Sequence, residues 1–418
     1  MTIRVVQFSK TRLAGAPIRI ANAVNSHTSI RVRHVDSERW GIFDHDHVHI
    51  EEPEQTLNLA ENADVIHLYN YLDLDSDAFA PVDFRDLERK GKRFVRHFES
   101  TPMRIAKHMG VSAETVVDDP LPQIVIAQYP ERFFPRARVV PNIVPESSPL
   151  YAESSDPIAW DVLHGPSNGQ TAWQTRWESK GQRETLEMLK SIERESGYTF
   201  RSVSAVTHHE LMAMKRRAGI LIDELVTGSY HLSTLEGLCL GRPVLAFLDP
   251  RTEHVLREIS GTSTAPVVNV RLEDAGPVIK WLVSHPEERQ EIGRASRQWI
   301  EDHWSESTMA KHIEGVYVDL LENPERITRQ RELSIDVGMS SFFHIHLPDA
   351  IFRARSEKDR LLSQTESKLD AIEQSRWHRL GALLDRLGKK RAVEKLVSRF
   401  PSLGKLKKVV HSFPPRAD

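Results

Sequence analysis

Cysteine is almost absent from this sequence: Cys239 is the only one in 418 residues. Neither a disulfide framework nor a cysteine-rich zinc site can therefore be built, and a reducing compartment is expected. Long apolar runs are missing as well, since no stretch approaches the ~18 residues that a membrane-spanning helix needs. The short apolar run near the N-terminus does not fit a signal peptide. We therefore expect a cytoplasmic protein in which Cys239 is a buried helix residue.

Two common catalytic signatures are also missing. The sequence has no G-x-S-x-G nucleophile elbow and no G-x-x-x-x-G-K-[ST] phosphate loop, which argues against an α/β-hydrolase and a P-loop nucleotidase. What remains is a soluble globular composition, with 39% hydrophobic and 28% charged residues. The length favours two domains with room for an appendage.

The net charge of −3 is unevenly distributed along the chain. Residues 386–410 contain nine Lys and Arg against one acid, a net charge of +8, so residues 1–385 carry −11. Within this basic segment Val393, Leu396, Val397 and Phe400 recur at helical spacing. The pattern is typical of an amphipathic helix on an anionic membrane surface. A helix docked on the body of the protein, or a disordered basic tail, is the alternative.

Short β-branched runs alternate with helical patterns over the first 322 residues, which predicts parallel sheets with crossover helices. The expected strands are 3–8, 64–69, 92–98, 123–127, 138–140, 200–206, 219–225, 243–247 and 266–270. A proline- and serine-rich stretch at 141–157 is the best candidate linker. A helix over 207–218 is expected to begin with a capping box formed by Thr207 and Glu210.

The predicted fold class is therefore α/β, with two Rossmann-like parallel-sheet domains that face each other across a cleft. We expect a first domain at 1–150, a second domain at 151–322, and a helical tail with a basic amphipathic segment at 323–418. Ligands of open α/β sheets bind at the carboxyl ends of the strands, so the cleft is the expected site.

A candidate site lies in GSYHLSTLEGLCLGRPVLAF, residues 228–247. After the strand expected at 219–225 comes a loop and then a helix, whose cap we expect at Ser229 or Ser233. The free N–H groups and the positive dipole at such a helix start suit a phosphate. Glu236 lies about one turn further in, where its carboxylate can accept two hydrogen bonds from a ribose diol. Together these features predict a nucleotide-binding site.

This stretch resembles the signature of GT-B glycosyltransferases of the family 4 type, in which a loop and a Glu-bearing helix precede G-x-P-V and a strand. LHGPSN (163–168), the Lys-Gly pair at 180–181 and ILIDELVTGSY (220–230) resemble further motifs of the capsule and surface-polysaccharide branch. The resemblance covers roughly residues 1–322. It implies the GT-B fold, a nucleotide-diphosphate sugar as donor, no bound metal, and transfer with retention at the anomeric carbon.

The resemblance also implies roles for individual residues. Glu236 would bind the donor ribose, and the backbone of Ser233, Thr234 and Leu235 would face the diphosphate. Lys180 would neutralise the leaving diphosphate, since electrostatic help is what a transferase without a metal must supply. In the N-terminal domain, Gly15 would lie near the donor phosphates and His97 beside the transferred sugar. Further positions expected on the donor side are Asn168, Gly228, Tyr230 and His231.

The sequence departs from the family pattern at two places. The family usually has two Glu separated by seven residues, and the first contacts the sugar; Gly228 occupies that first position here, as a glycine does in the capsule branch. Asp223, Glu224 or His231 could replace the missing contact. The Arg that partners the family Lys is also not at the expected position, and Arg176 is the candidate substitute.

Three alternating histidines, His45, His47 and His49, stand in FDHDHVHIEE (43–52) and resemble zinc ligands in type and spacing. Nothing else in the chain supplies a matched partner, so we read a polar, half-exposed strand or loop and expect no metal.

The function predicted from sequence is a glycosyltransferase of surface polysaccharide or glycan biosynthesis. Its partners would be a nucleotide sugar, a glycan or lipid-linked acceptor and, through 386–410, an anionic membrane surface at the cytoplasmic face; no nucleic acid is expected. The alternatives are a non-catalytic GT-B-like binding or scaffold protein and a nucleotide-sugar 2-epimerase.

Overall fold

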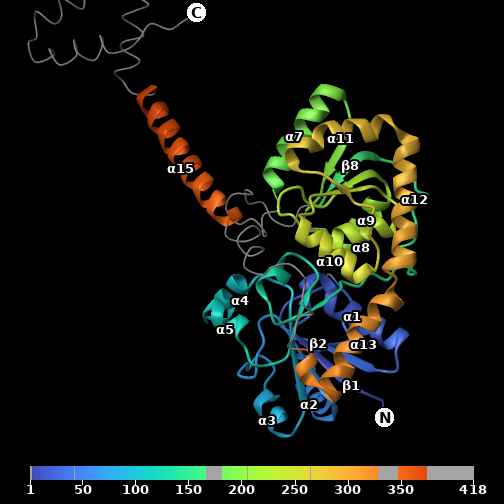
Figure 1. Cartoon of the computed structure of the whole chain (residues 1–418), viewed down its shortest axis with the longest axis vertical. Helices are drawn as coiled ribbons and strands as arrows, with labels where there is room; N and C mark the ends of the chain where they lie inside the picture. Colours follow the sequence, from blue (N-terminus) through green and yellow to red (C-terminus); the bar gives the residue numbers. More distant parts are fainter. Residues whose placement is uncertain are drawn as a thin grey trace, which may run out of the picture. The chain divides into compact units, whose positions relative to one another are not determined.

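The computed structural model describes residues 2–41, 43–165, 181–204, 206–263, 265–327 and 347–373. By its internal contacts the chain divides into two units, residues 1–346 and 347–418. Both parallel sheets lie in the first unit (Figure 1).

The first sheet holds seven strands within the described residues, in the order β3-β2-β1-β4-β5-β6-β7, and all their pairings are parallel. Val5 of β1 pairs with Val32 of β2 on one side and with Val65 of β4 on the other. The strands are β1 (Arg4–Ser9), β2 (Arg31–Asp36), β3 (His47–Val48), β4 (Val65–Tyr69), β5 (Arg93–Phe98), β6 (Gln123–Ile126) and β7 (Arg138–Val140). Crossovers between them contain helices α1 (Ala16–His27), α2 (Pro53–Asn62), α3 (Phe84–Arg89), α4 (Pro102–Met109) and α5 (Ala113–Val117), and 3-10 turns η1 (Leu13–Gly15) and η2 (Tyr129–Phe133).

The second sheet holds five parallel strands in the described residues, in the order β12-β11-β10-β8-β9. They are β8 (Trp160–His164), β9 (Phe200–Ser202), β10 (Ala218–Ile222), β11 (Val244–Ala246) and β12 (Val268–Asn269). The helices that follow them are α7 (Gln182–Ser196), α8 (His208–Arg216), α9 (Leu232–Cys239), α10 (Pro250–Ser260), α11 (Leu272–Ser284), α12 (Pro286–His303) and α13 (Glu306–Glu322), with the turn η3 (Pro324–Arg326). The two sheets confirm the predicted fold class.

The beginning of α8 forms as the sequence predicts. Thr207 accepts a hydrogen bond from the Glu210 backbone N–H, and the Glu210 carboxylate accepts one from the Thr207 N–H at 2.8 Å. This capping box satisfies two N–H groups that the helix itself leaves unpaired. It fixes where α8 starts, and therefore which of its side chains face α9.

Helix α13 lies against the first sheet, although it follows the second sheet in the chain (Figure 1). It packs on α1 and β5. Its Tyr317 hydroxyl accepts a hydrogen bond from Gln7 on β1 at 3.0 Å, and Asp319 pairs with Arg138 of β7 at 2.7 Å. The packing of the first sheet therefore depends on a helix that lies about 300 residues after β1 in the chain.

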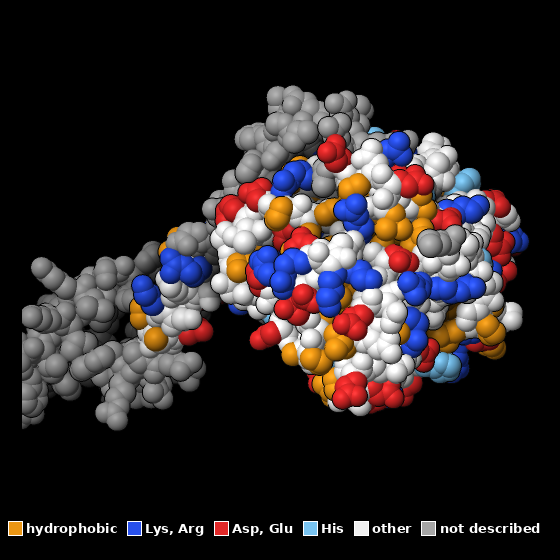
Figure 2. Space-filling model, turned by 90° about the horizontal axis from the view of Figure 1, so that it is seen from below, with side chains coloured by type: hydrophobic (Ala, Val, Ile, Leu, Met, Phe, Trp, Pro, Cys, Tyr) orange, Lys and Arg blue, Asp and Glu red, His pale blue; other side chains and the backbone are white. Residues whose placement is uncertain are grey.

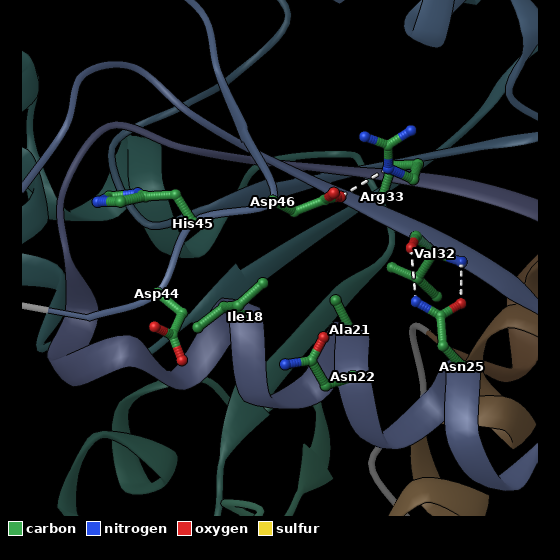
Figure 3. Close-up of a pocket in the computed structure, with 9 residues that line it drawn as sticks. All are labelled: Ile18, Ala21, Asn22, Asn25, Val32, Arg33, Asp44, His45 and Asp46. Carbon is green, nitrogen blue, oxygen red and sulfur yellow. Dashed lines mark hydrogen bonds and ion pairs between the residues drawn. The ribbon is translucent and has the colours of Figure 1, made fainter.

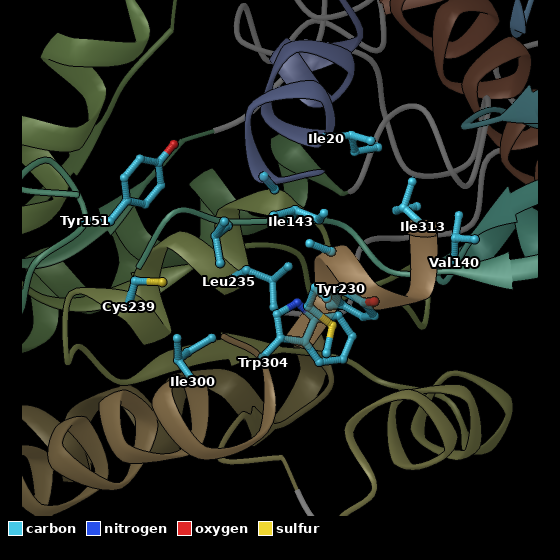
Figure 4. Packing of buried hydrophobic residues seen from close by; sticks show 14 of the residues in the cluster. Ile20, Val140, Ile143, Tyr151, Tyr230, Leu235, Cys239, Ile300, Trp304 and Ile313 are labelled. Carbon is cyan, nitrogen blue, oxygen red and sulfur yellow. The ribbon is translucent and has the colours of Figure 1, made fainter. Parts of the chain in front are cut away.

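One hydrophobic cluster includes residues from both sheet domains (Figure 4). Ile20 of α1 and Val140 of β7 belong to it, together with Leu235 and Cys239 of α9 and Trp304. Cys239 is completely buried there, as predicted. Because the cluster is continuous, the start of α9 is tied by packing to elements of the first sheet.

The second unit contains α15 (Leu347–Glu373) within the part of the chain described, and this stretch was predicted to be helical. Four of its apolar side chains are exposed, namely Leu361, Leu362, Leu369 and Ile372. No helix among the described residues is long and apolar enough to cross a membrane. On the face of the first unit seen in Figure 2, acidic and basic side chains are interspersed.

Candidate functional site

Glu236 is buried in α9 with both carboxylate oxygens paired. Lys215 of α8 donates to Oε2 at 2.5 Å and also to the Ser233 hydroxyl at 2.8 Å, while His208 Nε2 donates to Oε1 at 2.8 Å. Glu236 and Lys215 are only 3% and 2% exposed. Burial raises the pKa of Glu236, but the charge of Lys215 and the bond from His208 outweigh it and bring that pKa to about 2. Glu236 is therefore a fixed, ionised acceptor.

Helix α9 begins at Leu232 with His231 at the cap position, so the expected cap at Ser229 or Ser233 is wrong. Asp223, the residue that follows β10, holds this helix start in place. Its Oδ2 accepts from the His231 N–H at 2.7 Å and from the Thr234 hydroxyl at 2.6 Å. The carboxylate thus holds the cap residue and a side chain of the first turn, whereas a Ser or Asp at the cap position binds a backbone N–H of that turn.

The backbone conformation and the close packing at position 228 explain why a glycine stands there, which the family pattern does not reveal. Its φ is +85°, and a Cβ placed on it would lie 3.0 Å from both Cβ and Oδ2 of Asp249. The Gly228 carbonyl also accepts from the Asp249 N–H at 3.1 Å and from the Thr252 hydroxyl at 2.8 Å. A side chain here would be strained and would displace Asp249.

Glu224 organises the loop that leads to Gly228. Its carboxylate accepts hydrogen bonds from the backbone N–H groups of Val226, Thr227 and Ser229, at 3.0, 2.6 and 3.1 Å. Burial raises the pKa of Glu224 to about 7 despite these bonds. Asp223 and Glu224 were considered as replacements for the family Glu that is missing at Gly228. Both instead hold the loop and the helix start in place.

The segment η2 joins the first-sheet domain to this loop. The Tyr129 N–H donates to the Ser229 hydroxyl at 3.0 Å. Glu131 forms a bidentate pair with Arg251 of α10, with both distances 2.7 Å. Arg132, the next residue in the chain, donates a hydrogen bond to Asp249. These contacts fix the carboxyl end of β6 against the start of α10.

His97 lies at the end of a hydrogen-bonded relay inside the first sheet. Since the Tyr317 hydroxyl accepts from Gln7, its hydrogen is available to His67 Nδ1, 2.9 Å away. His67 Nε2 lies 3.2 Å from His97 Nδ1; in the tautomer in which His67 Nδ1 accepts from Tyr317, His67 Nε2 donates to His97 Nδ1 and the hydrogen of His97 lies on Nε2. Burial lowers the pKa of His97 to about 3, so the ring is neutral.

The Nε2 atom of His97 is buried and has no hydrogen-bond partner within the described residues. In that tautomer the neutral imidazole presents an unpaired N–H at the carboxyl end of β5, a donor that a substrate oxygen can satisfy. This is the position at which the resemblance expects a histidine beside the transferred sugar.

Gly15 caps α1 with φ +73°, and residues from elsewhere pack closely on it. A Cβ at this position would lie 2.7 Å from the Phe43 ring and 3.1 Å from Arg19. The Phe43 ring also lies 5.4 Å from the ring of His208. Through Phe43, the start of α1 is therefore linked to the group around Glu236.

The remaining predicted positions are distributed as follows. His231 is buried beside Asp223, with 3.2 Å between Nδ1 and Oδ1. Tyr230 is completely buried in the hydrophobic cluster and packs edge-on against Trp304. Ser233, Thr234 and Leu235 form the first turn of α9. Asn168, Arg176 and Lys180 lie outside the described residues.

His47 and His49 are buried and His45 is partly buried, whereas Asp44 and Asp46 are exposed, so the expectation of a half-exposed segment is confirmed. His45 Nδ1 lies 2.6 Å from Asp36, while His47 and His49 both contact the Thr56 hydroxyl, at 3.0 and 3.2 Å. Each ring is therefore held by a partner of the first sheet domain. Within the described ranges no three His, Cys, Asp or Glu side chains are placed to hold a metal ion.

A cavity of about 240 Å³ lies between α1 and the segment 44–46 (Figure 3). Asp46 on one wall pairs with Arg33 at 2.7 Å, and Asn25 on another bonds the Val32 backbone. Neither His97 nor Glu236 lines it. This cavity is separate from the predicted site.

Comparisons with known proteins bear on the fold. No family model and no curated protein matches the chain. An α-glucosyltransferase solved with UDP-glucose and DNA is similar, with a TM-score of 0.53 and 11% identity over 76% of this chain and 99% of that one. A sucrose-phosphate synthase from Thermosynechococcus elongatus (TM-score 0.49, 12% identity, 77% and 99% coverage) is also similar. So is a putative UDP-N-acetylglucosamine 2-epimerase from Listeria monocytogenes (0.44, 10%, 79% and 99%).

At these identities the likeness shows the fold alone. The match to the glucosyltransferase, together with the two parallel sheets, defines a GT-B fold. It leaves the family 4 assignment and the capsule branch as predictions.

Sequence reasoning missed Lys215, His208 and Arg132, which carry much of the polar geometry around the predicted site. Lys215 and Glu236 lie on different helices, 21 residues apart, and Arg132 reaches a partner 117 residues away. No local pattern marks such pairs. The only available signal was the capping box at Thr207, which fixes where the turns of α8 fall.

Proposed function

We propose that this chain is a retaining glycosyltransferase that moves a sugar from a nucleotide-diphosphate sugar to an acceptor hydroxyl. The observation that carries the proposal is the buried, ionised Glu236 behind the start of α9 in a GT-B fold. A carboxylate kept charged in the interior is costly unless it is paired, and Lys215 and His208 supply that pairing here.

Glu236 has acceptor capacity beyond its internal partners. Each carboxylate oxygen has two lone-pair sites, and Lys215 and His208 account for one direction on each oxygen. The remaining lone pairs are suited to the two hydroxyls of a ribose. By resemblance, the backbone of Ser233, Thr234 and Leu235 in the first turn of α9 faces the adjacent phosphates, with the Thr234 N–H itself bonded to the His231 carbonyl at 3.0 Å.

In the proposed transfer, the acceptor oxygen bonds to the anomeric carbon while the bond from that carbon to the diphosphate oxygen breaks. The electron pair leaves with the diphosphate, which also receives the proton of the acceptor hydroxyl. His97 Nε2–H donates to an oxygen of the transferred sugar. By resemblance, Lys180 and Arg176 offset the charge that develops on the diphosphate, and Asn168 lines the donor side.

The proposal includes a role in surface polysaccharide or glycan biosynthesis, with an acceptor-side domain at 1–150, a donor-side domain at 151–322 and a tail at 323–418. The basic segment 386–410 supports a lipid-linked acceptor at an anionic membrane face. Removing residues 386–418 should then reduce binding to vesicles that contain anionic phospholipid. Equal binding of the full and shortened chains would reject the membrane part of the proposal.

The activity is tested with a panel of nucleotides and nucleotide sugars. A thermal-shift screen with UDP, GDP, dTDP and CMP identifies the base, because a ligand of the folded state raises the unfolding temperature. Release of nucleotide from the matching sugars is then compared between the wild type, Glu236→Gln and the exposed control Glu88→Gln. Loss of both binding and turnover in Glu236→Gln, with the control unchanged, supports a transferase.

Other outcomes of the same assay are informative. Donor binding without turnover in the wild type favours the scaffold alternative. Conversion of the bound sugar to its 2-epimer favours an epimerase. Because Glu236 is buried, the unfolding temperature of Glu236→Gln without ligand is measured first, so that a folding defect is not mistaken for a lost contact.

A further inference from the structure

The cavity between α1 and the segment 44–46 has no part in the proposed transfer. Its volume of about 240 Å³ lies below the ~300 Å³ at which pockets for drug-sized ligands begin, which suits a smaller group such as one sugar ring. Ile18, Ala21 and Val32 give it an apolar lining, while polar and charged side chains surround them (Figure 3). A few polar groups around an apolar surface are the usual composition of a small-molecule site.

The two walls of the cavity are held in place by hydrogen bonds to β2. On one wall, Asn25 donates to the Val32 carbonyl and accepts from the Val32 N–H, both at 2.8 Å. On the other, Asp46 Oδ2 accepts from Arg33 Nε at 2.7 Å and from the His34 N–H at 2.9 Å. The cavity is therefore formed before any ligand arrives, which lowers the entropic cost of binding.

Two polar side chains at the cavity are left for a ligand. Asn22 of α1 and Asp44 opposite it are exposed, and no hydrogen bond or ion pair joins either to another described residue. The Asp44 carboxylate accepts only, whereas the Asn22 amide both donates and accepts, so hydroxyl groups can satisfy both.

The charges at the cavity exclude other kinds of ligand. The carboxylate of Asp44 repels an anion, and the guanidinium of Arg33 is already paired with Asp46. Within the described ranges no three His, Cys, Asp or Glu side chains are placed to hold a metal ion. The cavity therefore favours an uncharged or amine-bearing polyol.

A smaller hollow adjoins the cavity and shares Ile18, Asp44 and His45 with it. At about 10 Å³ it has room for a single hydroxyl or water. His34 also lines it; this ring is only 2% exposed, and its Nδ1 is buried with no hydrogen-bond partner among the described residues.

The chemistry of His34 follows from its contact with Asp36. Burial raises the pKa of Asp36, but the bonds from His34 and His45 outweigh it and lower that pKa. His34 Nε2, 3.2 Å from Asp36 Oδ1, therefore carries the hydrogen of the neutral ring, which makes Nδ1 an acceptor. The hollow thus offers a buried acceptor to a ligand hydroxyl.

We propose that this cavity binds one sugar unit that carries no negative charge. The apolar face of the ring lies over Ile18, and its hydroxyls bond to Asn22 and Asp44. A hydroxyl that reaches the smaller hollow donates to His34 Nδ1. Because the cavity is separate from the proposed reaction centre, the unit is a further part of the acceptor glycan and not the part that reacts. Its place in the acceptor rests on the proposed function; the sugar site itself does not.

Saturation-transfer NMR of the full chain with four trisaccharides tests the site. Maltotriose and triacetylchitotriose are neutral, chitotriose carries amines, and trigalacturonate is acidic. Asn22→Trp places an indole at the cavity and should weaken binding of the best neutral or amine-bearing probe about tenfold or more. Ser26→Trp, an exposed position of α1 outside the cavity, should bind as the wild type does. Unchanged binding in Asn22→Trp, or a wild type that binds none of the neutral and amine-bearing probes, overturns the proposal.

The charge of Asp44 gives the site a second signature. Chitotriose should bind about two- to fivefold more tightly than triacetylchitotriose, the size of an exposed ion pair. Asp44→Asn should remove this preference, and the exposed control Asp77→Asn should retain it. Tighter binding of trigalacturonate than of chitotriose, or a preference that Asp44→Asn leaves intact, overturns the proposal.

These titrations contain no nucleotide, so they separate the sugar site from the transferase activity. Cavity-dependent sugar binding by a chain that turns over no nucleotide sugar would support the site and reject the proposed function. Turnover of a nucleotide sugar by a chain that binds none of the probes would reject the site and leave the proposed function in place.

Discussion

Arg132 forms a two-point ion pair with Asp249, across the two sheet domains. Its Nη1 donates to Oδ2 at 2.8 Å and its Nη2 to Oδ1 at 3.3 Å, and both side chains are buried. The same Asp249 caps α10 by accepting from the Thr252 N–H. One carboxylate therefore starts a helix, holds η2 against it and occupies the space beside Gly228.

Breaking this pair should weaken the attachment of η2 to the second domain. Arg132→Gln leaves Asp249 buried without its counter-charge, and we expect a loss of about 3–5 kcal/mol in unfolding free energy. Hydrogen exchange should rise in residues 226–231. The control is Arg136→Gln, whose exposed pair with Asp118 should contribute about 1 kcal/mol or less. Similar losses in both variants would show that the pair has no special role.

The pair between Lys215 and Glu236 allows a sharper stability test. Lys215→Met should cost about 3–5 kcal/mol, since it leaves the buried carboxylate of Glu236 with the bond from His208 but without its counter-charge. Adding Glu236→Leu to that variant should restore part of the loss, because two apolar side chains no longer bury a charge. Urea unfolding measures both steps, and a double variant less stable than the single one contradicts this account.

Glu236 should also contribute to acid unfolding. Its pKa in the folded protein, about 2, lies below the ordinary value of 4.5. The stability that it contributes is therefore complete above pH 4.5 and is lost as the pH falls towards 2. Denaturant midpoints of wild type and Glu236→Gln, measured from pH 6 to pH 2.5, should converge at the acid end. Parallel curves would mean that another group governs acid unfolding.

Gly228→Ala should be destabilised by more than its backbone conformation explains. Strain of a non-glycine residue at positive φ costs about 1–2 kcal/mol, and the contact with Asp249 adds to it. Gly261→Ala is the matched control, since Gly261 has φ +68° but open space around its Cα. If the two variants unfold at the same denaturant concentration, the contact with Asp249 carries no cost.

Tyr317 is predicted to act on His97 through His67. Tyr317→Phe removes the hydroxyl that donates to His67 Nδ1, so the hydrogen of His97 is no longer confined to Nε2. In the proposed reaction we expect kcat to fall about tenfold with little change in KM, the size of one hydrogen bond to the reacting sugar. Nitrogen chemical shifts of the His97 ring should report a mixture of tautomers.

Tyr198→Phe is the control for this variant, because Tyr198 packs on α7 and α11 residues away from His97. A Tyr317→Phe ring spectrum identical to the wild type would contradict the relay, whatever happens to turnover.

The repeated strands and the capping box were predictable because they depend on residues close together in sequence. Thr207 and Glu210 are three apart, and their reciprocal bonds appear as expected. The start of α9 was not predictable in the same way. Its capping group, Asp223, belongs to the segment after β10, and only the folded loop brings it to His231. Local pattern cannot distinguish this from a cap at Ser229 or Ser233.

The partners of the three histidines were not predictable either, because they lie outside the stretch that contains the histidines. FDHDHVHIEE was predicted to be a polar, half-exposed strand or loop, and Asp44 and Asp46 are indeed exposed there. Asp36 and Thr56 offer partners for His45, His47 and His49, and so the rings can be buried. Glu236 was correctly singled out by its context, but its partners Lys215 and His208 follow from the packing of α8 against α9.

The position of α13 has a consequence for how the protein is made. Gln7 leaves the ribosome long before its partner Tyr317, which is synthesised 310 residues later. Until then α1 lacks the helix that covers it, and its apolar residues stay open to unwanted contacts. The amino-terminal domain therefore cannot finish folding as it emerges. Its completion waits for the domain that follows it, so a nascent chain stalled before α13 is the state most in need of a chaperone.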